Sequence, residues 1–170
     1  MSKKIVFSDK RTLDKLNNKK PKREVSNVWN KNKYLTNKKN QISILNQLFL
    51  ENDFEGKEFV KKEVERKLKS YKSQDNKKHV FEPSKFIVYG DLMEKLVISK
   101  LKCYYCRCNC LLMYDNVREK KQWTLDRINN GLGHHNDNTV ICCLECNLKK
   151  GTMNDEKFKF TKQLKITKLY

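Results

Sequence analysis

Apolar positions are sparse over residues 1–40 and recur with helical spacing from residue 41 onward. The segment 41–50, QISILNQLFL, is apolar enough for a short helix. A second helix is predicted after it, because apolar residues repeat there at spacings of four, four and three and so share one helical face. They are Val60, Val64, Leu68 and Tyr71. We expect this helix pair to be a scaffold for packing or for the approach to DNA, without a catalytic side chain.

The second half of the chain shows shorter patterns. Pro83 and Ser84 are typical of a helix start, which favours a helix through FIVYGDLMEKLVISK, residues 86–100. The segments LLMYD (111–115) and QWTLDRI (122–128) are rich in apolar and β-favouring residues. They predict two short strands.

A loop and two more helices complete the pattern. Residues 129–138, NNGLGHHNDN, have the Gly and Asn content of a loop. After a brief extended piece, the next residues predict a helix that ends near Gly151, and a last amphipathic helix starts at Asn154 or Asp155. The expected fold is therefore a small α+β protein, with a helical segment over residues 41–82.

The distribution of charge indicates that the N-terminal segment differs from the rest of the chain. The chain carries 38 Lys and Arg against 20 Asp and Glu, a formal net charge of +18. This balance favours a polyanionic partner, because neutralised phosphates release counterions when a basic protein binds nucleic acid. Residues 1–40 carry 13 basic and 3 acidic side chains and few apolar ones, which predicts a flexible basic arm. Within it, KKPKR (19–23) is similar to a nuclear-localisation cluster, or is simply a solvated charge run.

An acidic membrane surface would also attract such a chain, but the sequence does not predict insertion. No apolar run approaches the roughly 18 residues of a membrane span, and the first residues lack the apolar core of a signal peptide. We expect a soluble, intracellular protein in a reducing compartment, without a membrane partner.

Seven cysteines lie in two tight clusters of the C-terminal half. Two pairs have the C-x-x-C spacing that lets both thiolates reach one ion, and together they predict a tetrahedral zinc site with four cysteine ligands. The pairs are Cys103 with Cys106 and Cys143 with Cys146. An odd number of cysteines in a chain without a secretory signal argues against a disulfide framework. A closed site of four cysteines has no open position for substrate, so its zinc would be structural.

Three cysteines remain outside the two pairs: Cys108, Cys110 and Cys142. We expect them to be free or buried thiols. Cys108 could replace Cys106 as a ligand if the spacing were shifted. A redox C-x-x-C is the alternative for either pair, but it would need only one of them.

The C-x-x-C pairs together with TLDRINN, GHHNDN and CCLECNLKKG resemble the HNH endonuclease family of ββα-metal fold, over about residues 90–165. The resemblance implies a nuclease domain over residues 83–170. It also implies Mg²⁺- or Mn²⁺-dependent hydrolysis of DNA, in the nucleus or wherever a viral or phage genome lies.

The resemblance assigns roles to individual residues. Asp126 matches the metal-binding acid of the family, and Asn147, directly after the last zinc cysteine, matches its final ligand. Asn138 matches the loop asparagine that holds the finger in shape. A carboxylate and an amide oxygen suit a hard cation such as Mg²⁺, which also takes phosphate oxygens from the substrate.

Arg127 occupies the position at which the family has a histidine general base, and a guanidinium cannot accept a proton. Three alternatives remain. The loop histidines His134 or His135 could supply the base, and His134, four residues before Asn138, fits better. The attacking water could instead lose its proton to solvent while Arg127 grips phosphate. In the third alternative, the domain has lost cleavage and only binds nucleic acid.

Basic side chains around this motif predict a rim that contacts phosphates. They are Arg118, Lys120, Lys121, Lys149 and Lys150. We expect duplex or branched DNA as partner, with RNA as a weaker possibility, and a dimer if both strands are cut. The rival function is a zinc-stabilised DNA-binding module without catalysis.

Overall fold

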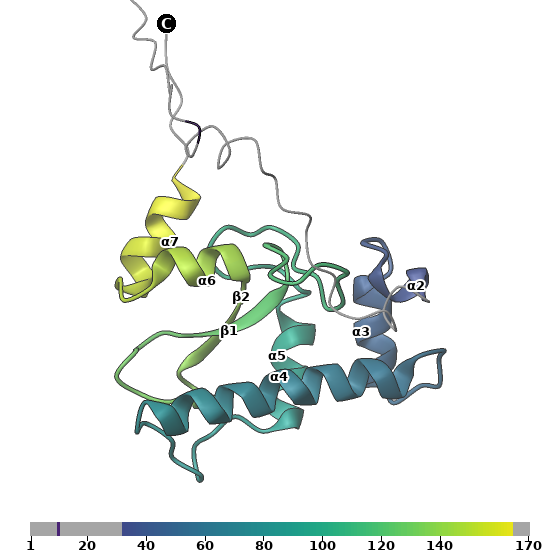
Figure 1. Ribbon diagram of the computed structural model, residues 1–170, viewed down its shortest axis with the longest axis horizontal. Helices are drawn as coiled ribbons and strands as arrows, with labels where there is room; N and C mark the ends of the chain where they lie inside the picture. Colours follow the sequence, from purple (N-terminus) through teal and green to yellow (C-terminus); the bar gives the residue numbers. More distant parts are fainter. Residues whose placement is uncertain (1–9, 11–31, 165–170) are drawn as a thin grey trace, which may run out of the picture.

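The computed structural model describes residue 10 and residues 32–164. Over residues 32–164 the chain forms six helices and one two-stranded sheet (Figure 1). The elements are α2 (Lys33–Thr36), α3 (Gln41–Phe49), α4 (Lys57–Lys77), α5 (Tyr89–Ile98), β1 (Trp123–Arg127), β2 (Thr139–Cys143), α6 (Leu144–Lys150) and α7 (Asp155–Gln163). The predicted α+β class is confirmed for this part of the chain.

Helix α4 is the longest helix described and runs along one side of the sheet (Figure 1). Its buried residues include Val60, Val64 and Tyr71, and Leu68 is partly buried against the same core. The helical face predicted from the spacing is thus confirmed. The same face continues to Asp75, which is fully buried four residues after Tyr71.

Helix α3 joins the first described residues to the core. Its first residue, Gln41, is buried, and its amide group donates to the carbonyls of Leu35 and Asn37 at 2.9 Å each. The amide oxygen of Gln41 accepts from the backbone N–H of Met113 at 2.9 Å. Leu35 itself is buried, so the folded part of the chain begins before residue 41. The KKPKR cluster and most of the predicted arm lie outside the described residues.

The sheet is an antiparallel pair in which Trp123 faces Cys143 and Arg127 faces Thr139. The strand predicted at QWTLDRI is confirmed, as is the extended piece after the loop. The strand predicted at 111–115 is wrong: Leu111 makes only an isolated bridge to Gln122. The apolar residues of that segment are buried in the core, so their hydrophobicity reflects packing and not strand pairing.

The helix predicted to start at Pro83 and Ser84 begins later, at Tyr89. The residues before it are held extended against the loop, because the Ile87 N–H donates to the carbonyl of His134 at 2.9 Å. The predicted boundaries of the last two helices are confirmed. Helix α6 ends at Gly151, which has φ of +53°, and Asn154 caps α7 by accepting from the N–H of Lys157 at 3.1 Å.

One hydrophobic core unites the two halves of the described chain. Its buried residues extend from Leu35 in α2, through α3, α4 and α5, to Phe158 in α7. The cysteine-bearing segment therefore packs directly on the helical segment that precedes it. Among the described residues, no helix is both long enough and apolar enough to cross a membrane.

Candidate functional site

Four cysteine sulfurs form a compact group at the junction of β2 and α6. The Sγ atoms of Cys103, Cys106, Cys143 and Cys146 all lie within 4.8 Å of one another. Cys106 and Cys143 are 3.9 Å apart, sulfur to sulfur. A tetrahedral zinc site with Zn–S bonds of about 2.3 Å requires sulfur separations of about 3.8 Å. The predicted cluster is thus confirmed as a group that could hold a metal ion, and the identity of the metal stays a prediction.

The other three cysteines are not members of this group, although Cys110 contacts Cys103, and Cys108 contacts Cys106 and Cys143. Cys142 points to the opposite face of β2, where its sulfur lies 3.2 Å from the hydroxyl of Thr124. Burial raises the pKa of the Cys142 thiol well above its usual value. Cys110 is also buried, whereas Cys108 is half-buried. The geometry favours Cys106, and not Cys108, as the second member of the first pair.

The outer edge of β1 is bonded to side chains and not to a third strand. From α4, Lys67 donates to the carbonyl of Trp123 at 2.6 Å, and the hydroxyl of Tyr71 accepts from the N–H of Leu125 at 3.0 Å. From α6, Asn147 donates to the carbonyl of Leu125 at 3.2 Å. These bonds satisfy backbone groups that would otherwise be buried without partners. They hold α4 and α6 on either side of the strand.

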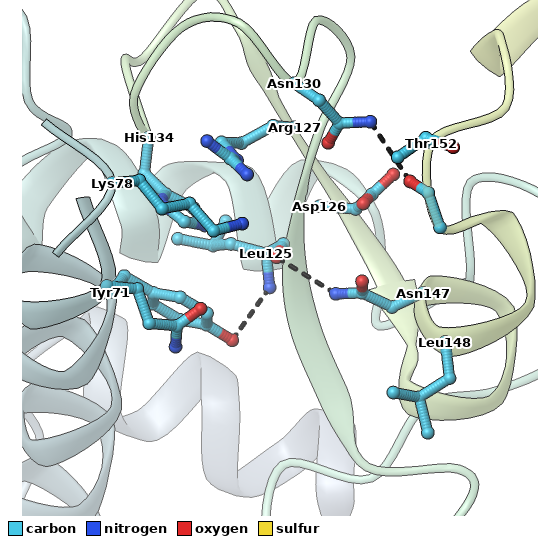
Figure 2. A pocket seen from close by; sticks show the side chains of 12 residues that line it. Tyr71, Lys78, Leu125, Asp126, Arg127, Asn130, His134, Asn147, Leu148 and Thr152 are labelled. Carbon is cyan, nitrogen blue, oxygen red and sulfur yellow. Dashed lines mark hydrogen bonds between the residues drawn. The ribbon is translucent and has the colours of Figure 1, made fainter. Parts of the chain in front are cut away.

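A pocket of about 510 Å³ lies along this edge, between α4 and α6 (Figure 2). Four residues of the predicted site line it: Asp126, Arg127, His134 and Asn147. Tyr71 and Lys78 contribute to the wall from the side of α4. The fold thus brings together side chains from a strand, a loop and two helices.

Asp126 is buried, and both of its described polar contacts go to one carboxylate oxygen. Oδ2 accepts from the hydroxyl of Tyr105 at 2.5 Å and lies 3.0 Å from the ammonium of Lys150. Oδ1 makes no hydrogen bond to a described residue. The ion-pair partner of Asp126 is therefore Lys150 and not its neighbour Arg127.

The amide of Asn147 has a defined orientation. Its nitrogen donates to the hydroxyl of Thr124 at 3.1 Å and to the carbonyl of Leu125 at 3.2 Å. Since a carbonyl only accepts hydrogen bonds, the nitrogen must occupy this position, which leaves the amide oxygen of Asn147 for a ligand. Asn147 does not cap helix α6, because the N-cap of that helix is Cys143. A purely structural capping role therefore does not account for this residue.

Arg127 lines the pocket, and one nitrogen of its guanidinium group already donates a hydrogen bond to the loop. Nη1 donates to the carbonyl of Leu132 at 2.8 Å, which ties the arginine to the loop. The other guanidinium donors have no hydrogen-bond partner among the described residues. Arg127 can therefore contact an anion, but it cannot act as a base.

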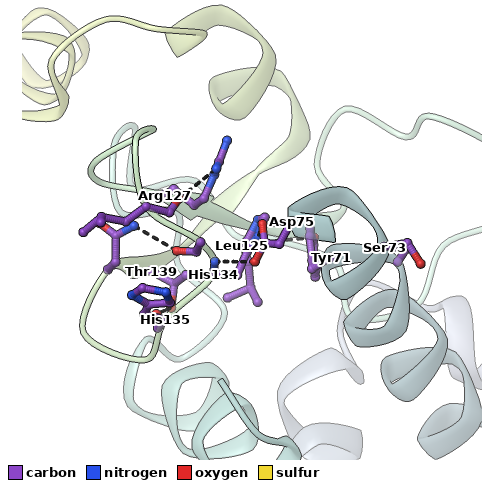
Figure 3. Close-up of polar contacts among 12 residues, drawn as sticks. Tyr71, Ser73, Asp75, Leu125, Arg127, His134, His135 and Thr139 are labelled. Atoms are coloured by element: carbon purple, nitrogen blue, oxygen red, sulfur yellow. Dashed lines mark hydrogen bonds and ion pairs between the residues drawn. The ribbon is translucent and has the colours of Figure 1, made fainter. Parts of the chain in front are cut away.

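His134 extends from the loop towards α4, where it contacts two side chains (Figure 3). Its Nδ1 lies 2.7 Å from Oδ1 of Asp75, and its ring centroid lies 4.7 Å from that of Tyr71. Burial lowers the pKa of His134 below its usual value, and nearby Arg127 and Lys78 lower it further, whereas Asp75 opposes the shift. Its burial therefore favours the neutral imidazole over the imidazolium.

The other two loop residues of the predicted site lie outside the pocket lining. His135 is buried, and its Nε2 makes no hydrogen bond to a described residue; the nearest carboxylate, that of Glu82, is 3.6 Å away. Asn138 joins the two ends of the loop, since its side chain bonds the N–H and the carbonyl of Asn129 and the carbonyl of Gly133. Of the two histidines, only His134 faces the pocket.

The side chains of the predicted phosphate-contacting rim are exposed at all positions but one, and their contact with phosphate stays a prediction. Arg118, Lys120, Lys121 and Lys149 are exposed, whereas Lys150 is 1% exposed. Lys150 is paired with Asp126 and donates to the carbonyl of Arg127 at 2.7 Å, so its place in the rim is wrong.

Asp75 and Tyr105 contact the site residues, but neither was among the predicted site residues. The sequence contains a signal for Asp75: it follows Tyr71 by four residues on a buried helical face, where an acidic residue needs a partner. The contact of Tyr105 with Asp126 had no comparable signal, because tyrosines between zinc-type cysteines commonly pack beneath the metal.

Comparisons with known proteins show a similarity to a viral protein over part of the chain. A stretch of 65 residues, 38% of the chain, is 45% identical to an uncharacterized protein of Acanthamoeba polyphaga mimivirus. The match spans 10% of that viral protein's length. No family model matches the chain. No solved structure matches it.

Proposed function

We propose that this protein is an HNH-type, metal-dependent nuclease that hydrolyses phosphodiester bonds in DNA. The observation that carries the proposal is the convergence of Asp126, Asn147 and His134 on one pocket. These residues offer two oxygen ligands and a neutral imidazole, which are the groups that such a reaction needs. The four-cysteine group would hold a structural zinc ion that fixes the start of α6.

The oxygens of the pocket fit a divalent cation that is shared with the substrate. Oδ1 of Asp126 and the amide oxygen of Asn147 are both without hydrogen-bond partners among the described residues. Two protein ligands are too few for a tightly held ion, and the ammonium of Lys150 beside the carboxylate weakens binding further. Mg²⁺ is commonly held by one or two protein groups plus substrate phosphates, and it would stabilise the charge that develops on the scissile phosphate.

His134 is the proposed general base. The attacking water gives a proton to the imidazole as its oxygen bonds to phosphorus, and the bond from phosphorus to the leaving 3′ oxygen breaks. The leaving oxygen then takes a proton from solvent. The lowered pKa of His134 keeps the imidazole free to accept that proton at neutral pH. His134 thus takes the role that Arg127 cannot fill.

Arg127 and Lys78 are the proposed phosphate contacts. Both line the pocket, and both carry donors that no described residue engages. Their charges would orient the phosphodiester and offset its negative charge in the transition state. Exposed lysines outside the pocket, such as Lys120 and Lys121, would add affinity that depends on salt and not on sequence.

One observation favours a non-catalytic nucleic-acid-binding module instead. Lys150 and Tyr105 both occupy Oδ2 of Asp126, so one of the two oxygens of this carboxylate is already used. A site that had lost its metal could be filled in this way. Binding driven by the basic surface would need no divalent cation, which separates the two functions experimentally.

The test is conversion of supercoiled plasmid to nicked circles by zinc-loaded protein with Mg²⁺ or Mn²⁺. We expect metal-dependent nicking, and a loss of about 100-fold or more in rate for Asp126→Ala and for His134→Ala. Single-stranded DNA and RNA of the same sequence serve as parallel substrates, because the fold alone does not fix the substrate.

The matched control is His79→Asn. His79 is an exposed histidine outside the pocket, with a positive φ that Asn tolerates. It should cleave like the wild type. A folded wild type that binds nucleic acid equally with Mg²⁺ and with a chelator of Mg²⁺, and cleaves none of the substrates, would refute the nuclease and leave the binding module.

A further inference from the structure

Asp75 is a fully buried acidic residue near the end of α4. Both of its carboxylate oxygens contact the same residue, His134. Oδ1 lies 2.7 Å from Nδ1 of His134, and Oδ2 accepts from the backbone N–H of His134 at 2.6 Å. The carboxylate therefore holds the imidazole and the peptide of His134 together (Figure 3). These two contacts fix both the position of the loop backbone at His134 and the orientation of its imidazole ring.

The contact also determines which nitrogen of His134 carries the proton. An ionised carboxylate only accepts hydrogen bonds, so Nδ1 of the neutral imidazole must be the donor. The lone pair is then on Nε2, at the opposite side of the ring. Nε2 makes no hydrogen bond to a described residue, and His134 lines the pocket that also contains Asp126. This tautomer is the one that a general base in the pocket requires.

Helix α4 also sets the relative positions of the histidine and the strand. Tyr71, one turn before Asp75, packs its ring on His134 and accepts from the N–H of Leu125, the residue before Asp126. One face of α4 thus contacts both the loop that carries His134 and the strand that carries Asp126. The distance between the two functional residues consequently depends on α4.

The charged groups that act most strongly on His134 come from α4 and from β1. Asp75 and Lys78 lie at and after the end of α4, and Arg127 lies at the end of β1. The negative charge of Asp75 offsets the two cations and supports the histidine when it takes up a proton. Without Asp75, the charges that act most strongly on a protonated His134 would be those of Arg127 and Lys78.

We propose that Asp75 is a positioning residue for His134, which selects its Nδ1–H tautomer and holds the loop on α4. The proposal rests on the proposed function, in which His134 is the general base. It extends the site to a helix that precedes the catalytic strand by a long stretch of chain. The minimal nuclease unit would then include α4 and not only the segment that carries the cysteines.

The test is Asp75→Asn, read by the histidine ¹⁵N shifts of the zinc-loaded protein. The amide oxygen of Asn can still accept from the His134 N–H, while its NH₂ group faces Nδ1 as a donor. The chain has three histidines, so the signals can be assigned with His79→Asn and His134→Gln. We expect the wild type to show the Nδ1–H tautomer and Asp75→Asn to show the Nε2–H tautomer, with cleavage reduced about 10- to 100-fold.

The outcomes separate this inference from the nuclease proposal. A wild-type His134 in the Nε2–H form overturns the positioning role without any variant, which keeps the test valid if Asp75→Asn does not fold. An unchanged tautomer and unchanged cleavage in a folded Asp75→Asn protein also overturn it. A wild type that cleaves no nucleic acid refutes the nuclease, whatever the tautomer is.

Discussion

At the residue scale, Lys67 shows how strongly the surroundings of one side chain change its chemistry. Its ammonium donates to the carbonyl of Trp123 and lies 4.5 Å and 4.9 Å from the ring centroids of Trp123 and Tyr114. Loss of water around the ammonium, with a smaller repulsion from Arg66, lowers the pKa of Lys67 to about 7. Its ordinary value of 10.5 applies to the unfolded chain.

The lowered pKa predicts how stability depends on pH. Between pH 7 and 10.5 the unfolded chain holds a proton at Lys67 that the folded chain has lost, so the free energy of unfolding rises with pH. We expect a rise of about 1.4 kcal/mol per pH unit between about pH 8 and pH 10, absent in Lys67→Met. Urea unfolding of both proteins in excess zinc measures the difference.

Lys69→Met is the control, because Lys69 is an exposed lysine of the same helix. Its pH dependence should match that of the wild type. Parallel stability curves for the wild type and Lys67→Met over this pH range would contradict the prediction.

At the scale of elements, the site depends on how closely the loop approaches the end of α4. A Cβ atom added at Gly133 would lie 2.5 Å from the carbonyl oxygen of Val80 and 3.0 Å from Oδ2 of Asp75. A backbone atom cannot move aside as a flexible side chain can. Glycine is therefore required at residue 133 for the contact between the loop and the helix.

We expect Gly133→Ala to lower the free energy of unfolding by about 1–3 kcal/mol, because the loop must move away from α4. Cleavage should fall as well, since the contact of Asp75 with His134 is lost. The control is Gly131→Ala in the same loop, where an added Cβ would meet only the side-chain oxygen of Asn129, at 3.2 Å. Denaturant unfolding and plasmid nicking check both effects, and equal behaviour of the two variants would contradict the argument.

At the scale of the whole molecule, the two-stranded sheet is too small to form a core of its own. Helix α6 contacts both strands, α5 contacts β2, and α4 lies along the outer edge of β1, where Tyr71 bonds Leu125 (Figure 1). A metal ion in the four-cysteine group would join the residues before β1 to the end of β2. Its binding energy would then contribute to folding.

Metal removal should therefore destabilise the whole described core. We expect one zinc ion per chain, and chelation should lower the melting temperature by on the order of 10 °C or more. Cys106→Ser should lose the zinc, whereas Cys108→Ser should keep it. Zinc content and circular dichroism during heating measure these effects, and loss of zinc from Cys108→Ser alone would show that the ligand set is shifted.

Local patterns explain which features of the fold were predictable. The face of α4, the ends of α6 and α7 and the strand at QWTLDRI each follow from residues close together in the sequence. The strand predicted at 111–115 failed because apolar residues serve equally well for strand pairing and for core packing. The helix start at Pro83 failed because the loop, far along the chain, holds the next residues extended.

The sequence by itself determined the cysteine pairs and the α+β class, since short spacings and residue types carry that information. The candidates Asp126, His134 and Asn147 came from the resemblance to the HNH family. Only the tertiary structure showed that His134 lines the pocket and His135 does not, because both are loop histidines with similar neighbours in sequence. It also removed Lys150 from the surface and paired it with Asp126. The contact of Asp75 with His134 joins residues 59 positions apart, and the packing of a helix on a loop decides such a contact.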